Sequence, residues 1–172
     1  GGLPGVAGGA EGDYGLVLDD AGLLSPSTGE YIDALLAGLE RDTGAKVRVL
    51  CPPARLRFNA EAWKEYLRPV YKKMRVDTAT LAITAEISAR TLGKSRKQVM
   101  DSLIQMNMGF RLQERFQYGL TNNFLSSVAN HFGAQDYVER AGTDAAIRDA
   151  AENVAASIYS LVDREAERKR GP

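Results

Sequence analysis

The strongest constraint in the sequence is a strand–helix–strand pattern between residues 16 and 51. An apolar run over 16–18 predicts a short strand, and Ser25 with Pro26 marks a helix start, because serine caps helices and proline fits their first turn. Gly44 is typical of a helix end, and apolar–charged alternation over 46–51 predicts a strand with one solvent-exposed face. Between these signals, apolar residues recur at helical spacing at Ile32, Leu35, Leu36 and Leu39.

The alternation of strands and helices continues along the chain. Asn59 favours a second helix running to about Met74, with a kink or break at Pro69. Strands are predicted over 81–85 and 103–108, and two further helices follow Thr121 and Thr143. We therefore expect an α/β sandwich in which a central, mostly covered four-stranded sheet is flanked by helices.

The predicted organisation is one domain with two extensions, in line with a length of 172 residues. Residues 1–15 include seven glycines without periodicity, which favours a flexible arm. Residues 16–163 form the predicted domain, and the polar residues 164–172 are expected to be the projecting end of the last helix. The first residue is glycine, so we expect a processed form or a fragment.

Composition excludes several classes of protein and site. Lys and Arg total 22, as do Asp and Glu, and a net charge of zero argues against a dedicated nucleic-acid binder. No apolar run is long enough for a transmembrane span. The single cysteine, Cys51, and the single histidine, His131, exclude an internal disulfide and a Cys/His zinc site.

The middle of the chain is basic. Residues 64–115 carry 11 basic and 5 acidic side chains, and both flanking segments are net acidic. Two interpretations of the basic stretch within this segment remain open: it docks on an acidic partner or anionic lipid, or it is a solubilising loop. The residues concerned are Arg90, Lys94, Arg96 and Lys97.

Carboxylates at predicted strand ends are the candidates for metal chemistry. Asp19 and Asp20 follow the first strand, and Asp77 precedes the third. Ligands of α/β sheets bind at strand ends, and converging carboxylates there bind hard cations such as Ca²⁺ or Mg²⁺. The alternative is that these residues only cap loops and face water. No glycine-rich phosphate loop or nucleophile elbow accompanies them.

Several segments, from Val17-Leu-Asp19 through Val76-Asp77-Thr-Ala-Thr-Leu81 to Gly142-Thr-Asp-Ala-Ala-Ile147, follow one another in a familiar order. Together they resemble the TPM domain family, most closely small plant and algal thylakoid-lumen proteins. The resemblance covers about Leu16 to Val162. It begins with Val17-Leu-Asp19, Leu24-Ser25-Pro26 and Leu39-Glu-Arg-Asp-Thr-Gly44. It continues through Val76-Asp77-Thr-Ala-Thr-Leu81, Leu103-Ile-Gln-Met-Asn-Met-Gly109 and Gly142-Thr-Asp-Ala-Ala-Ile147.

The resemblance implies a fold, a compartment and two classes of function. The family fold is a central sheet between helices. Members are linked to photosystem II assembly and repair, and some are reported as acid phosphatases or Ca²⁺ binders. The family's acidic cluster corresponds to Asp19 and Asp77, but a further acidic position falls on Asn122, and residues 88–101 resemble an insertion.

These departures favour a non-catalytic accessory protein of the chloroplast thylakoid lumen. It would bind a photosynthetic membrane complex, with photosystem II favoured, in assembly, repair or stabilisation. No cofactor is expected, although the resemblance leaves Ca²⁺ open. The alternative is a metal-assisted acid phosphatase of the TPM type.

Overall fold

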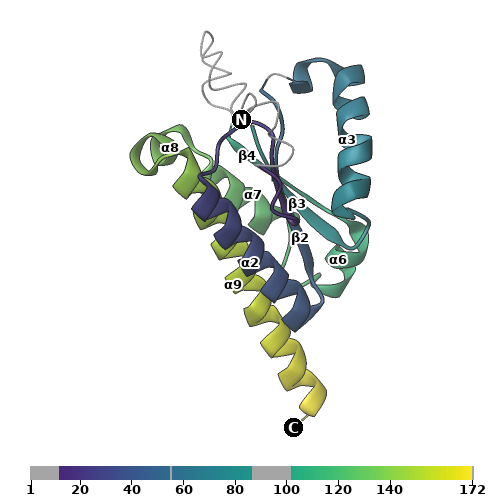
Figure 1. The fold of residues 1–172 in the computed structure, drawn as a ribbon. Coiled ribbons are helices and arrows are strands. Elements are labelled where there is room, and N and C mark those ends of the chain that lie inside the picture. The colour runs from purple at the N-terminus through teal and green to yellow at the C-terminus, as the bar shows by residue number, and fades with distance from the viewer. Residues whose placement is uncertain (1–11, 55, 87–101, 172) are drawn as a thin grey trace.

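In the computed structural model, which describes residues 12–54, 56–86 and 102–171, strands and helices alternate along the chain (Figure 1). The strands are β1 (Val17–Asp19), β2 (Lys46–Cys51), β3 (Thr80–Ala85) and β4 (Ile104–Met108). The helices are α2 (Pro26–Thr43), α3 (Ala60–Met74), α6 (Phe110–Arg115), α7 (Asn122–Phe132), α8 (Gln135–Ala141) and α9 (Thr143–Arg170), together with the 3₁₀ turn η1 (Leu56–Phe58). The predicted α/β class is confirmed.

The four strands form one sheet in the order β1-β2-β3-β4. The first three strands are parallel, and β4 is antiparallel to β3, with Ile83 opposite Met106. Helices α2 and α9 lie on one side of the sheet and α3 lies on the other (Figure 1). Both crossovers step in the same direction across the sheet but use opposite faces, so they have opposite hands. The usual preference for right-handed crossovers therefore does not hold for both.

Helix α2 follows the local signals in its sequence. Ser25 Oγ accepts a hydrogen bond from the Thr28 backbone N–H at 3.3 Å, and Gly44 ends the helix with a left-handed φ of +77°. Three members of the predicted apolar stripe are fully buried, whereas Leu35 is only partly buried. The buried members are Ile32, Leu36 and Leu39.

Helix α9 lies against α2 along much of its length and buries its own apolar stripe in the same core (Figure 1). Its last residues are exposed and extend past the sheet, as the polar end of the sequence predicted. In the part of the chain with described structure, no helix is long and apolar enough to cross a membrane.

On the second face of the sheet α3 covers β1 and β2, and here one prediction is wrong. Alternation over β2 predicted a solvent-exposed face, but Arg48 is only 3 % exposed. Its Nε donates to the Met74 carbonyl at 2.7 Å and its Nη1 to Glu40 Oε1 at 2.8 Å. The charge is buried because α3 lies over it. The break predicted at Pro69 does not occur either, since α3 is continuous through that residue.

Candidate functional site

Asp19 is a structural residue of the loop that leads into α2. One carboxylate oxygen accepts from the Ala21 N–H at 3.1 Å and the other from the Leu24 N–H at 2.8 Å. The residue is 5 % exposed. Both oxygens therefore hold the turn between β1 and α2, so Asp19 caps a loop as the alternative predicted, but it is buried and does not face water.

Asp77 occupies a turn at the opposite end of the sheet. It accepts from Lys46 Nζ at 2.8 Å, from the Ala79 N–H and from Thr80 Oγ1. The pKa of Asp77 is lowered to about 2, mainly by the hydrogen bond from Lys46 and next by that from the Ala79 N–H. The carboxylate is thus ionised and held by one lysine and one turn.

The predicted joint metal site of Asp19 and Asp77 is therefore wrong. Asp19 pairs with Cys51 at the end of β2, whereas Asp77 contacts Lys46 at its start. At about 3.3 Å per residue these ends lie about 16 Å apart. In a parallel sheet the carboxyl ends of the strands lie at one edge and the amino ends at the other. Asp19 stands at the carboxyl end of β1, whereas Asp77 precedes the amino end of β3, so the two lie at opposite edges.

Other predicted positions are also accounted for. Asn122 is exposed at the start of α7. Across residues 12–54, 56–86 and 102–171, no group of three or more His, Cys, Asp or Glu side chains is placed to hold a metal ion. The basic stretch lies outside the described residues; it comprises Arg90, Lys94, Arg96 and Lys97.

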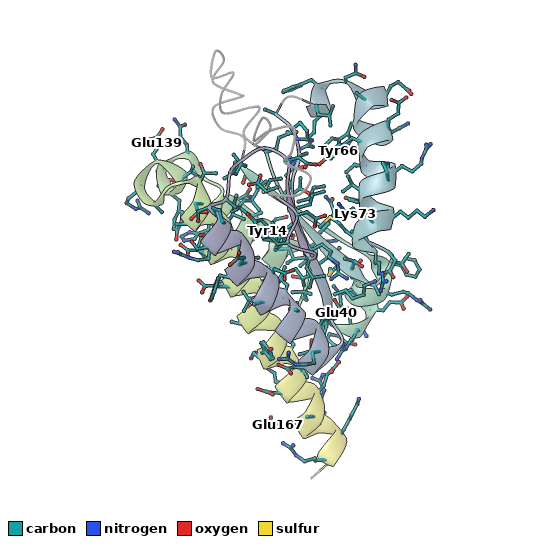
Figure 2. The ribbon with its side chains drawn as sticks, viewed as in Figure 1. Tyr14, Glu40, Tyr66, Lys73, Glu139 and Glu167 are labelled. Atoms are coloured by element: carbon teal, nitrogen blue, oxygen red, sulfur yellow. The ribbon has the colours of Figure 1, made fainter. Side chains whose placement is uncertain are left out.

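Near Asp19, Tyr66 and Asp20 join α3 to the end of β1. The Tyr66 hydroxyl donates to Asp20 Oδ2 at 2.6 Å, and the side chain points from α3 towards the sheet (Figure 2). Burial is the main cause that raises the pKa of Tyr66, and the bond to Asp20 adds to it. Burial likewise raises the pKa of the Cys51 thiol, with the charge of Asp19 second. The Tyr66 hydroxyl and the Cys51 thiol are therefore neutral at ordinary pH, and both residues act in packing and anchoring.

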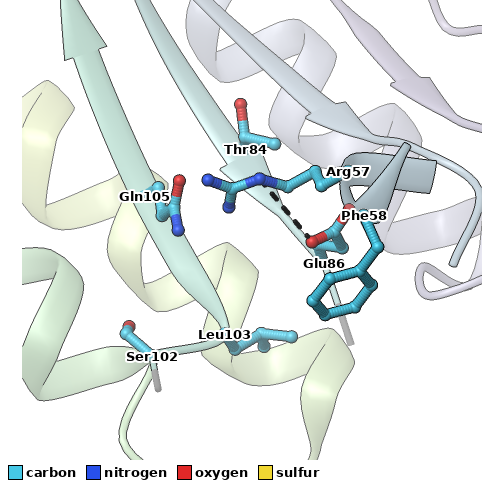
Figure 3. A pocket seen from close by; sticks show the side chains of 7 residues that line it. All are labelled: Arg57, Phe58, Thr84, Glu86, Ser102, Leu103 and Gln105. Atoms are coloured by element: carbon cyan, nitrogen blue, oxygen red, sulfur yellow. Dashed lines mark ion pairs between the residues drawn. The ribbon is translucent and has the colours of Figure 1, made fainter. Parts of the chain in front are cut away.

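A pocket of about 220 Å³ opens at the carboxyl end of β3, on the face that α3 partly covers. Turn η1 forms one wall, and β3, β4 and the residue before β4 form the other (Figure 3). The lining residues are Arg57, Phe58, Thr84, Glu86, Ser102, Leu103 and Gln105. Ligands of open α/β sheets bind at this end of the strands, which makes the pocket the candidate site.

A loosely paired carboxylate and guanidinium dominate the pocket. The Glu86 side chain is 9 % exposed, and its Oε1 lies 3.9 Å from Arg57 Nε. Its Oε2 is buried and has no hydrogen-bond partner among the described residues. Burial raises the pKa of Glu86, opposed by the charge and the backbone N–H of Arg57. The Arg57 guanidinium also lies 5.9 Å from the centre of the Trp63 ring.

The uncharged lining supplies further polar groups and an apolar wall. Gln105 is exposed, and Arg57 extends across the pocket towards it (Figure 3). Leu103 is fully buried, while Phe58 is 61 % exposed. The Ser102 hydroxyl already makes hydrogen bonds within the fold, because it donates to the Ala129 carbonyl and accepts from the Ile104 N–H.

The strand beside the pocket, β4, lies at one edge of the sheet that the described residues form. The Leu103 carbonyl bonds to Glu86 and the Gly109 N–H bonds to Thr80, so odd-numbered residues of this strand face β3. Alternation in an antiparallel pair then turns the backbone groups of Met106 and Met108 outwards. No hydrogen bond of these groups to another described residue is present. The strand carries no charged residue or proline, the usual protections of an edge.

Sequence reasoning did not identify this site. Arg57 follows a proline-rich turn and Glu86 follows β3, and no motif joins two residues so far apart in the sequence. One signal could have pointed to Glu86: it is a carboxylate placed directly after an apolar strand. The same kind of position was the reason for selecting Asp19.

Comparisons with known proteins bear on the fold. No protein-family model and no curated protein matches this chain. The chain is similar to the solution NMR structure of the N-terminal domain of a protein from P. gingivalis, with 15 % sequence identity and a TM-score of 0.59. The similarity covers 94 % of this chain and 91 % of that one. At this identity it shows a shared fold, which agrees with the predicted sheet between helices.

Proposed function

We propose that the protein is a non-catalytic accessory protein that binds another polypeptide along β4. The observation that carries this proposal is the edge strand itself, with outward backbone groups at Met106 and Met108 and exposed amide side chains at Gln105 and Asn107. Extended peptides add to such edges through main-chain hydrogen bonds, and alternate side chains give specificity. The pocket opens beside the same strand, so side chains of a bound segment can reach it.

The positions of the carboxylates favour binding over metal-assisted phosphate hydrolysis. The acidic residues that would activate water on a phosphate lie at opposite ends of β2. Asp19 and Asp77 each accept hydrogen bonds on both carboxylate oxygens, which hold turns. A cation between two such distant groups would lack a shared set of ligands.

The identity of the partner comes from the resemblance to the TPM family. On that basis the partner is a photosynthetic membrane complex, with photosystem II favoured, and the compartment is the thylakoid lumen. The bound function is assembly, repair or stabilisation of that complex. The basic stretch of residues 90–97 is a second proposed contact with the membrane surface.

A pull-down from solubilised thylakoids tests this proposal. Asn107→Lys places a charge on the exposed edge, which opposes strand addition and leaves the β3–β4 pairing in place. Asn130→Lys makes the same change at an exposed position near the end of α7 and serves as the control. Photosystem II subunits, identified by mass spectrometry, should be retained by the parent and the control and lost with Asn107→Lys.

Two results would count against the proposal. Equal retention by both variants would exclude β4 as the docking edge. Phosphomonoester hydrolysis by the purified protein that disappears in Asp77→Asn would favour the phosphatase.

A further inference from the structure

The Arg57 guanidinium is a charged donor group that makes few polar contacts with the described residues. It has five N–H donors in a planar fork. Its nearest carboxylate oxygen is 3.9 Å away, beyond hydrogen-bond distance, and it makes no hydrogen bond to another residue in the described ranges. The side chain is 36 % exposed and extends into the pocket (Figure 3). Within the part of the chain that the structure describes, the donors of Arg57 are therefore open to a ligand.

We infer that this pocket binds a carboxylate through Arg57 and that Glu86 takes up a proton when the ligand binds. The site would take an acidic side chain, a chain terminus or a small organic acid. This inference goes beyond partner docking at β4, because it concerns a carboxylate bound in the pocket and can be tested with small organic acids on the isolated protein.

The chemistry of the lining selects a singly charged planar anion. A guanidinium fork matches the two oxygens of a carboxylate in a bidentate pair. Gln105 and Thr84 line the same pocket and bring an amide and a hydroxyl, both of which can donate hydrogen bonds. Phe58, which is 61 % exposed, supplies an apolar surface for the body of an organic acid. A doubly charged phosphate fits less well, because it would bring two negative charges against one arginine and a nearby carboxylate.

Binding and protonation are coupled through the shared arginine. Among the described residues that line the pocket, Arg57 is the charged group facing Glu86. A ligand that engages Arg57 removes the counter-charge of Glu86 and adds a second negative charge nearby. Both effects favour the neutral form of a buried carboxyl group. Uptake of one proton makes the ligand bind more tightly as pH falls, by at most about tenfold per pH unit.

NMR titration of the ¹⁵N-labelled protein with formate and with butyrate tests the inference. At about pH 5.5 both anions should shift the backbone and side-chain amides of Gln105, with butyrate bound more tightly because of the apolar wall. Affinity should weaken at about pH 7.5, where Glu86 is ionised more often. Arg57→Gln should abolish the shifts, and Arg57→Lys should weaken binding because the fork is lost.

Glu86→Gln gives the sharpest result, since it mimics the protonated state. This variant should bind formate more tightly than the parent does at about pH 7.5, and its affinity should not vary between about pH 5.5 and 7.5. Glu167→Gln makes the same change at the exposed end of α9 (Figure 2) and should behave as the parent.

Other outcomes would overturn the inference. Tighter binding of butylammonium than of butyrate, weakened by Glu86→Gln, would make this a cation pocket. Stronger shifts with inorganic phosphate than with formate would make it a phosphate site. Absence of shifts with either organic anion would exclude anion binding, and an unaltered affinity in Glu86→Gln would exclude the proton coupling. A failure of β4 docking leaves these results unchanged.

Discussion

Gly109 joins β4 to α6, and its replacement by alanine should strongly destabilise the fold. A Cβ at this position would stand 2.1 Å from the Thr78 carbonyl oxygen and 2.4 Å from its carbonyl carbon. Both are backbone atoms, so no flexible side chain can move aside. The φ of Gly109 is −66°, an ordinary value, so the requirement for glycine is one of space.

The magnitude follows from the displacement needed. Restoring an acceptable contact requires a backbone shift of about 1 Å, and we expect a cost near the upper end for overpacked sites, about 3 kcal/mol. The shift also strains two 2.9 Å hydrogen bonds, from Gly109 N–H to the Thr80 carbonyl and from Arg111 N–H to the Thr78 carbonyl. For a protein of this size the midpoint of thermal unfolding should fall by about 6–12 °C.

Comparing the thermal unfolding of Gly109→Ala with that of Gly22→Ala distinguishes the cost of steric overlap from the cost of backbone strain. Gly22 has a left-handed φ of +71°, and a Cβ added there would have no atom within 4 Å, so alanine costs strain alone, about 1 kcal/mol. Hydrogen exchange should also accelerate at the Gly109 and Arg111 amides. A loss for Gly109→Ala no larger than for Gly22→Ala would refute the argument from close approach.

Three further predictions concern the core, acid stability and the basic stretch. Leu36→Ala should lower the unfolding free energy by about 3–5 kcal/mol, and Leu35→Ala by clearly less, because Leu36 is fully buried and Leu35 only partly. In acid titrations the lowered pKa of Asp77 means that its ionised form stabilises the fold above about pH 4, and this contribution is lost as pH falls towards 2. Asp77→Asn should therefore be less stable than the parent at neutral pH and lack that part of the acid transition. Reversal of the basic stretch to glutamate should weaken co-sedimentation with thylakoid membranes at low salt but not at high salt, and unchanged low-salt binding would exclude docking there; the residues are Arg90, Lys94, Arg96 and Lys97.

Elements with strong local signals were predictable from the sequence. Helix α2 begins and ends where Ser25 and Gly44 indicated, and α7 follows the predicted Thr121 cap, whose side chain accepts from the Phe124 N–H. Such caps act over three or four residues and need no knowledge of tertiary contacts. The short helices α6 and α8 were missed, because neither has a side-chain cap nor a stripe long enough to show periodicity.

Features set by tertiary packing were not predictable. Arg48 alternates with apolar residues in β2 like a solvent-facing residue, but α3 crosses above it. Asp19 and Asp77 share a residue type but not a sheet end. Each case depends on which segments pack against one another in the fold, and a single sequence does not contain that information.

The surroundings of Glu86 make its carboxylate costly for the folded state. Helix α3 contacts β1 and β2 through Leu18 and Leu50, and the pocket opens over β3 and β4 beside it. A carboxylate that is 9 % exposed, with one oxygen unpaired among the described residues, destabilises the folded state when ionised. Its 3.9 Å pair with a partly exposed arginine recovers little of that cost.

Glu86→Gln should therefore make the ligand-free protein more stable at neutral pH. Because burial raises the pKa of Glu86, the folded state binds its proton more tightly than the unfolded state, and the parent loses stability as pH rises through that raised value. The variant lacks this loss, so the two proteins should have similar unfolding midpoints near pH 4 and diverge in favour of the variant above it. Denaturant unfolding at several pH values measures the difference. A variant less stable than the parent at neutral pH would mean that the pair with Arg57 outweighs the cost of burial, and Glu86 would then be a structural partner of Arg57 and not a proton-binding group of the site.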